Sequence, residues 1–134
     1  AGTSTYLKYA FPNICSYSVE PENFDDTKNS LEKGEILSNS PDSRSICDAL
    51  LAPQPGKLTF TINQSTLQGG LAVSEKEVKK TIITLAENLK IITEPGGAVA
   101  AAAVLHKKIN VQNKNVVVMI SGGNIDPEMF ASLK

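Results

Sequence analysis

The stretch SGGN at residues 121–124 directly follows the apolar run VVVMI, and it is the first candidate for chemistry. In sheets of parallel strands, ligands gather outside the carboxyl ends of the strands. Ser121 would lie at such an end, and Gly122 and Gly123 would let the backbone come close to a bound ring or phosphate. The alternative is a tight strand-to-helix turn without a ligand, in which Asn124 or Asp126 caps the helix.

A second candidate is the acidic stretch VEPENFDD at residues 19–26. Glu20 and Asp26 are separated by a proline turn that would fold the two carboxylates back together. With a backbone carbonyl such as that of Phe24, they would suit a hard cation that keeps several waters. The alternative is that Asp25 and Asp26 cap a helix while Glu20 is solvated.

The third candidate is ITEPGGAVAAAAVL at residues 92–105, where small side chains would let a helix approach a neighbour closely. Glu94 would lie at the positive end of that helix, where a carboxylate is favoured. The alternative is a buried helix with an acidic first turn. His106 is the only histidine, and no nucleophile with a paired base is visible.

Helices and strands alternate along the chain, which predicts an α/β fold with a mostly parallel sheet. A helix is expected over Thr3–Tyr9 with Thr3 or Ser4 as N-cap, a strand within 13–21, and a helix ending at Gly34. Residues 37–58 form a long irregular connection, which in a compact domain is usually functional.

The second half of the chain continues this alternation. A short strand within 69–78 leads into a helix that opens with the capping box Ser74–Glu77. Pro95 begins another helix, expected to end in the cations His106, Lys107 and Lys108. Residues 115–120 are apolar on both faces, as in a central parallel strand.

The composition is that of one ordinary globular domain, with 134 residues, 41% hydrophobic, and a formal net charge of −1. This charge gives no electrostatic reason to expect a nucleic-acid or membrane partner. The longest apolar run is far shorter than the roughly 20 residues that span a bilayer. Cys15 and Cys47 are too few for a disulfide framework or a zinc site, so reduced thiols and a cytoplasmic location are expected. No leader peptide is visible, and the first residue is not methionine, so the chain is either processed or cut from something longer.

Four stretches in this order carry a family resemblance: YSVEPENFDD, SICDALL, ITEPGGAVAAAAVL and VVVMISGGNID. Together the chain resembles the C-terminal half of the threonine dehydratase and serine racemase family, which are pyridoxal phosphate enzymes of the tryptophan synthase β fold (fold type II). The resemblance implies that residues 1–134 form a single partial domain. This would be the C-terminal part of the large domain, truncated on its N-terminal side, with a mostly parallel sheet flanked by helices.

The resemblance assigns cofactor roles to one group of residues. Ser121 would contact the pyridine nitrogen of pyridoxal phosphate, and a hydroxyl there leaves the nitrogen largely neutral. Glu94 would lie near the edge of the ring, and Gly122, Gly123 and Asn124 would hold the serine. Asp48 and Ala49 would belong to a loop that lines the substrate space. The family usually has Asp-Gly here, so the methyl group of Ala49 is expected to narrow the substrate space or to shift the backbone of the loop.

The resemblance also supports the cation site. Glu20, Asp26 and the carbonyl of Phe24 fall on the positions that bind a structural divalent cation in serine racemase and some dehydratases. Mg²⁺ or Ca²⁺ is therefore the expected ion.

The implied parent reaction removes water from a small hydroxyamino acid and gives a 2-oxo acid and ammonia. No catalytic residue is expected in this chain, because the Schiff-base lysine lies in the family's N-terminal half. The isolated chain is therefore expected to be an inactive fragment that self-associates as a homo-oligomer through the AVAAAAVL helix. A fragment of a racemase on the same scaffold and a non-catalytic assembly fragment remain alternatives. The substrate stays open among threonine, serine, hydroxyaspartate and a hydroxyectoine-derived compound.

Overall fold

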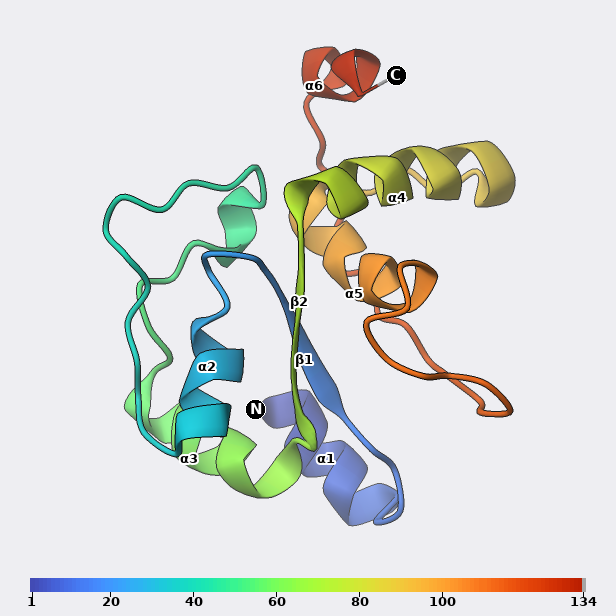
Figure 1. Cartoon of the computed structure of the whole chain (residues 1–134). Helices are drawn as coiled ribbons and strands as arrows, with labels where there is room; N and C mark the ends of the chain where they lie inside the picture. The colour runs from blue at the N-terminus through green and yellow to red at the C-terminus, as the bar shows by residue number, and fades with distance from the viewer. Residues whose placement is uncertain (134) are drawn as a thin grey trace.

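A two-stranded parallel sheet lies at the centre of the protein (Figure 1) in a computed structural model that describes residues 1–133. β1 (Tyr17–Pro21) pairs with β2 (Gly69–Val73) in a register that runs from Tyr17 opposite Gly69 to Pro21 opposite Val73. Strand β1 occupies only the end of the predicted range 13–21. The parallel α/β arrangement predicted from the alternation is confirmed.

Helices cover both faces of this sheet. α2 (Asp26–Lys33) contacts the strands on one side, and α5 (Pro95–Leu105) contacts them on the other (Figure 1). α4 (Glu75–Leu89) packs on α5, while α1 (Gly2–Ala10) packs against α3 (Lys57–Thr66). The layers follow from the need of each apolar helix face to find an apolar partner.

The core lies where α4 and α5 meet the sheet. Val78, Ile82 and Leu85 repeat at helical spacing along α4 and are buried. Each such side chain contributes roughly 1.5–3 kcal/mol when it is fully buried. Helix α5 is almost entirely buried, with Ala98 and Ala102 fully inaccessible. The expectation that the AVAAAAVL helix packs on a second copy is therefore wrong, because this chain's own core already covers it.

Local capping signals place three of the helix boundaries. The Ser74–Glu77 capping box is present, with the Ser74 N–H donating to Glu77 Oε2 at 2.7 Å. Asp126 caps α6 (Pro127–Ser132) by accepting from two backbone N–H groups at 2.8 and 2.9 Å. Gly34 ends α2 in the left-handed conformation, at φ 81°. Short-range patterns therefore predict these boundaries well.

Some boundary predictions are wrong. Helix α1 begins at Gly2, and neither Thr3 nor Ser4 is its N-cap. The Ser4 hydroxyl donates to the Ala1 carbonyl instead. Helix α5 ends at Leu105, so no cation lies in its last turn. The connection 37–58 is irregular apart from η1 (Asp48–Leu50) and the first residues of α3, a helix that was not predicted. The α3 sequence shows little sign of a helix, because its threonines and isoleucine have low helix propensity and Phe60 is the only residue of α3 that is buried.

Residues 115–120 do not form the predicted strand in the described structure. A strand requires a hydrogen-bonded neighbour, and β1 and β2 pair with each other in the sheet of the described residues. The apolar side chains of this segment are largely exposed, at 88% for Val117 and 65% for Met119.

Across residues 1–133, no helix combines the length and the apolar character that crossing a membrane requires.

Candidate functional site

The SGGN loop and the TEPGG segment are joined by three hydrogen bonds between residues 28 to 30 positions apart in sequence. The carbonyl oxygen of Gly122 accepts from the Thr93 hydroxyl at 2.8 Å and from the Glu94 N–H at 3.1 Å. The Asn124 N–H donates to Glu94 Oε2 at 3.1 Å. The loop that follows residues 116–120 is thereby fixed to the N-terminus of α5.

These two segments need glycine because their backbones lie too close together for a Cβ atom, and not because a residue adopts a positive φ. None of Gly97, Gly122 and Gly123 has a positive φ. A Cβ at Gly97 would lie 2.7 Å from the Gly122 oxygen, and one at Gly122 would lie 2.5 Å from Glu94 Oε1. A Cβ at Gly123 would lie 2.9 Å from the Ile92 oxygen. The glycines therefore let the two segments pack against each other, whereas the sequence suggested that Gly122 and Gly123 make room for a ligand.

Ser121 is exposed at the start of this loop. Its hydroxyl has no hydrogen-bond partner among residues 1–133, whereas the next residue, Gly122, is held by Thr93 and Glu94 directly before α5. A fixed backbone with a free hydroxyl is an arrangement that can present a hydrogen-bonding group to a ligand.

The η1 turn brings a third predicted segment to the same helix end. A Cβ at Gly96 would lie 3.4 Å from the Ala49 methyl group and 3.5 Å from Leu50 Cγ, so η1 packs on the first turn of α5. The preceding residues are anchored by the Ile46 N–H, which donates to Glu75 Oε1 at 2.7 Å. Asp48 is exposed. The methyl group of Ala49 therefore faces helix α5.

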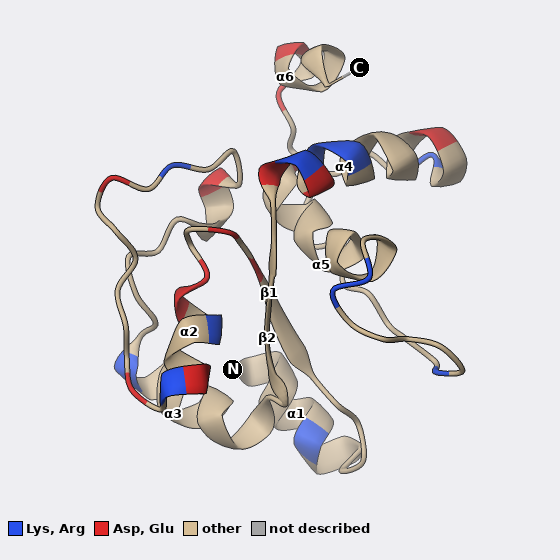
Figure 2. Cartoon of the chain, in the orientation of Figure 1, with Lys and Arg blue, Asp and Glu red and all other residues tan. Residues whose placement is uncertain are grey.

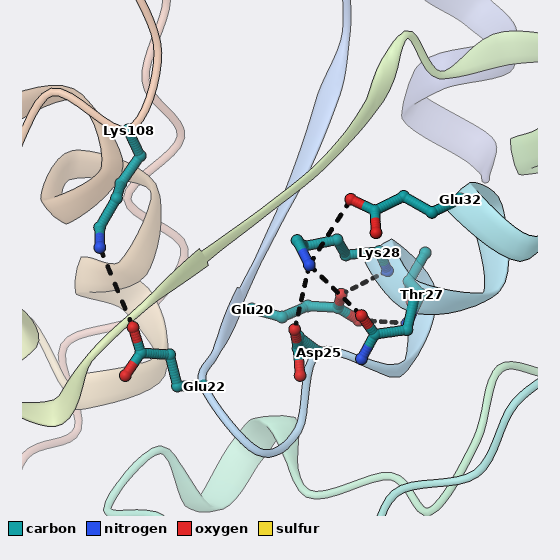
Figure 3. A network of polar contacts seen from close by, with 8 residues as sticks. Glu20, Glu22, Asp25, Thr27, Lys28, Glu32 and Lys108 are labelled. Atoms are coloured by element: carbon teal, nitrogen blue, oxygen red, sulfur yellow. Dashed lines mark hydrogen bonds and ion pairs between the residues drawn. The ribbon is translucent and has the colours of Figure 1, made fainter.

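Glu20 lies near the end of β1, and its side chain caps the N-terminus of α2 (Figure 3). Its two carboxylate oxygens accept from the N–H groups of Thr27 at 3.0 Å and Lys28 at 2.9 Å. Asp25 occupies the N-cap position, but its side chain makes no capping hydrogen bond. The N-cap position of Asp25 is therefore as expected, but the interpretation of Glu20 as a solvated residue is wrong. The hydrogen bonds expected from the side chains of Asp25 and Asp26 are made by Glu20, because the longer glutamate reaches the helix from the strand.

Burial dominates the electrostatics around Glu20 and Asp26. It raises the pKa of the Glu20 carboxyl although hydrogen bonds from Thr27 and Lys28 act in the opposite direction, and the charge of Asp26 raises it further. Burial also raises the pKa of Asp26, opposed by the hydrogen bond from Asn39. Two neighbouring carboxylates that are costly to charge are stabilised by a bound cation.

No salt bridge joins Glu20 or Asp26 to a basic side chain among residues 1–133. The Lys28 ammonium lies 3.4 Å from Asp25 and 3.5 Å from Glu32 instead (Figure 3). Residues 1–133 contain no group of three or more His, Cys, Asp or Glu side chains suited to a metal. A cation here would therefore depend on two carboxylates, the Phe24 carbonyl and water, which is a donor set that fits Mg²⁺ or Ca²⁺.

The sequence analysis did not identify the roles of two residues that hold these segments in place. The Thr93 hydroxyl donates a hydrogen bond to the glycine loop, and a threonine before Glu-Pro gives no sequence signal for such a bond. Lys108, expected to be a helix-end cation, lies 3.0 Å from Glu77 and 3.9 Å from Glu22.

Acidic residues gather at the β1–α2 connection and at the start of α4, whereas α5 carries no charge within its bounds (Figure 2). Lys108 thus links the β1–α2 connection to α4.

A parallel α/β unit with a Ser-Gly-Gly loop fixed to a Glu-Pro-Gly-Gly helix start defines a partial tryptophan synthase β-like domain of the pyridoxal phosphate class. The family model described as pyridoxal-phosphate dependent enzyme matches residues 1–122, and the chain belongs to this family.

The relatives include lyases and racemases. The chain is 35% identical to L-threonine ammonia-lyase of Thermotoga maritima over 132 residues, covering 97% of this chain and 32% of that protein. It is 38% identical to serine racemase of Dictyostelium discoideum over 129 residues, covering 94% of this chain and 40% of that protein. The crystal structure of a threonine deaminase from T.th. superposes with a TM-score of 0.87 at 34% identity, covering 93% of this chain and 45% of that one. The chain thus spans about a third to under half of these relatives.

Proposed function

We propose that this chain supplies the C-terminal part of a pyridoxal phosphate-dependent dehydratase that acts on a small hydroxyamino acid. The products would be a 2-oxo acid and ammonia. The similarity to L-threonine ammonia-lyase and to threonine deaminase supports this reaction class. The single structural observation that carries the proposal is the free, exposed Ser121 hydroxyl on a loop that is fixed to α5.

In this proposal the residues of the chain bind and orient the cofactor. When it is bound, pyridoxal phosphate supplies the electron sink for removal of the α-proton. Ser121 would hold the ring nitrogen through its hydroxyl, which leaves the nitrogen uncharged. That suffices for loss of a β-hydroxyl group, which needs no long-lived carbanion. Glu94, held by the Asn124 N–H, would lie near the ring, and Asp48 and Ala49 would line the substrate space.

The 134 residues are not expected to catalyse the reaction alone. In this family the lysine that carries the cofactor lies in the N-terminal half, whereas this chain covers only 32% and 40% of two matched relatives. L-threonine or L-serine should therefore give no 2-oxo acid with the isolated chain. A cytoplasmic location and homo-oligomerisation stay predictions, and sedimentation velocity of the chain tests the second.

The cofactor proposal is tested by titrating pyridoxal phosphate into the protein extended through its lysine-bearing part. A visible absorption band should appear, and Ser121→Ala should weaken binding by up to about tenfold, the effect of one lost hydrogen bond. The control is Ser65→Ala, an exposed serine on α3. A protein that stays colourless, or equal binding by both variants, would contradict the role of Ser121.

A racemase is the second candidate, because the 38% identity to serine racemase is as high as that to the lyases. Chiral analysis after incubation of the extended protein with L-serine separates the two. D-serine as the main product indicates a racemase, and pyruvate with ammonia indicates a dehydratase.

We also propose that Glu20, Asp26 and the carbonyl of Phe24 hold Mg²⁺ or Ca²⁺. The raised pKa values of the two carboxyls, and the lack of a salt bridge to either of them among residues 1–133, support this site. The ion would reduce the cost of burying two charges beside the N-terminus of α2.

A further inference from the structure

Thr93 is a fully buried residue between α4 and α5 whose bond to Gly122 helps to hold the loop, but the proposed function gives it no role in binding cofactor or substrate. A buried hydroxyl costs about 1–3 kcal/mol if it makes no hydrogen bond. The Thr93 hydroxyl lies 2.8 Å from the Gly122 oxygen and 3.2 Å from the Glu94 oxygen. It carries one hydrogen, and the shorter contact identifies Gly122 as its main acceptor.

The Gly122 carbonyl accepts a second hydrogen bond from the Glu94 N–H at 3.1 Å. A carbonyl oxygen has two lone pairs, so both acceptor positions of this oxygen are used. With both occupied, the peptide plane after Gly122 cannot rotate without breaking a bond. Glycine is otherwise the residue with the greatest freedom to rotate.

The neighbouring chain shows why this restraint matters. On its N-terminal side, residues 116–120 pair with no strand among the described residues, and Val117 is 88% exposed. Ser121 is therefore held from its C-terminal side, by the bonds at Gly122 and Asn124. Gly97 leaves room for them, because a Cβ there would lie 2.6 Å from Thr93 Oγ1.

We infer that Thr93 is a positioning residue whose hydroxyl, acting through the Gly122 carbonyl, sets the direction of the Ser121 hydroxyl. The hold on Gly122 is a property of this chain. The statement that Ser121 is thereby aimed at the ring nitrogen rests on the proposed function.

Amide hydrogen exchange of this chain tests the hold without any cofactor. Thr93→Val keeps the volume and removes the hydroxyl, so exchange at the Glu94 and Asn124 amides should rise about five- to tenfold. Thr93→Ser keeps the hydroxyl and should stay within about twofold of wild type. Thr81→Val is the matched control, because Thr81 is equally buried but its hydroxyl has no partner in the described structure.

The outcomes separate the hydroxyl from packing. Faster exchange in Thr93→Val, with Thr93→Ser and Thr81→Val near wild type, supports the inference. Equal exchange in Thr93→Val and Thr81→Val overturns it. If Thr93→Val does not fold, Thr93→Ala is compared with Thr93→Ser, because both lack the methyl group and only the serine retains the hydroxyl.

A second measurement addresses the ring. In the extended protein, the dissociation constant of pyridoxal phosphate should rise about tenfold in Thr93→Val and stay within about twofold of wild type in Thr93→Ser. Faster amide exchange in Thr93→Val together with an unchanged dissociation constant for pyridoxal phosphate would contradict the inference that Thr93 positions Ser121. If the unmodified protein binds no pyridoxal phosphate, the proposed function fails, and amide exchange alone still decides whether Thr93 holds Gly122.

Discussion

The Lys108 ammonium lies 3.0 Å from Oε1 of Glu77 and ties the turn after α5 to the first turn of α4. The other oxygen of Glu77 accepts the Ser74 N–H at 2.7 Å as part of the capping box. One carboxylate therefore caps a helix and binds a cation from another element. Both side chains are largely protected, with 30% of Lys108 and 20% of Glu77 exposed.

This pair predicts acid sensitivity. Burial by itself would raise the pKa of Glu77, but the Ser74 N–H and the Lys108 ammonium outweigh it and lower the pKa below the usual 4.5. Because the folded value is the lower one, ionised Glu77 stabilises the fold above pH 4.5, and this stabilisation is lost as the pH falls through the folded value.

Urea unfolding between about pH 7 and about pH 3 measures this loss. Glu77→Gln can still cap the helix but carries no charge, so its free energy of unfolding should fall less steeply on acidification than that of wild type. Glu87→Gln, at an exposed position late in α4, should follow wild type. Parallel curves for Glu77→Gln and wild type would rule out the pair as a source of acid sensitivity.

The two adjacent glycines of α5 should respond differently to the same substitution. A Cβ at Gly97 would lie 2.6 Å from Thr93 Oγ1, so Gly97→Ala should destabilise the fold by about 1–3 kcal/mol through overpacking. At Gly96 the nearest atom is 3.4 Å away, an ordinary contact, and alanine gains helix propensity. Gly96→Ala should therefore stay within about 1 kcal/mol of wild type.

Chemical denaturation of the two variants side by side gives the comparison. If Gly97→Ala were as stable as Gly96→Ala, the close contact of α5 with the glycine loop would not exist in solution.

Divalent cations should stabilise the fold through Glu20 and Asp26. A ligand at about one hundred times its dissociation constant adds about 2.7 kcal/mol, which corresponds to several degrees in Tm for a domain of this size. Thermal melting with Mg²⁺ or Ca²⁺ should show such an increase, and Asp26→Ala should abolish it. Asp42→Ala, at an exposed loop position, is the control. An absent shift, or an equal shift in Asp26→Ala, removes the site.

The two cysteines should differ in reactivity. Burial raises the pKa of the Cys47 thiol to about 11, against a lowering hydrogen bond from Ser45. Cys15 is exposed. Because the thiolate is the reactive form, iodoacetamide at about pH 8 should modify Cys15 in the native protein and both cysteines after denaturation. Peptide mass spectrometry locates the modification, and rapid labelling of native Cys47 would show that its surroundings open.

The sequence by itself determined the features that depend on residues a few positions apart. The Ser74–Glu77 box, the Asp126 cap before Pro127 and the end of α2 at Gly34 lie where their residue types predict. These signals work because a side chain or a backbone conformation satisfies the nearest unpaired N–H and C=O groups. The ordered motifs also led to the family, which the match over residues 1–122 confirmed.

Only the tertiary structure decided which distant groups meet. Thr93 bonds to Gly122, which lies 29 residues later in the sequence. Glu20, rather than Asp25 or Asp26, accepts the N–H groups at the start of α2. Residues 115–120 read as a strand from their apolar pattern, yet they have no strand partner in the described chain. The physical reason is that a segment's own side chains show which apolar surface it can bury and which hydrogen bonds it can donate. Which acceptor or neighbouring strand it meets depends on how the rest of the chain packs around it.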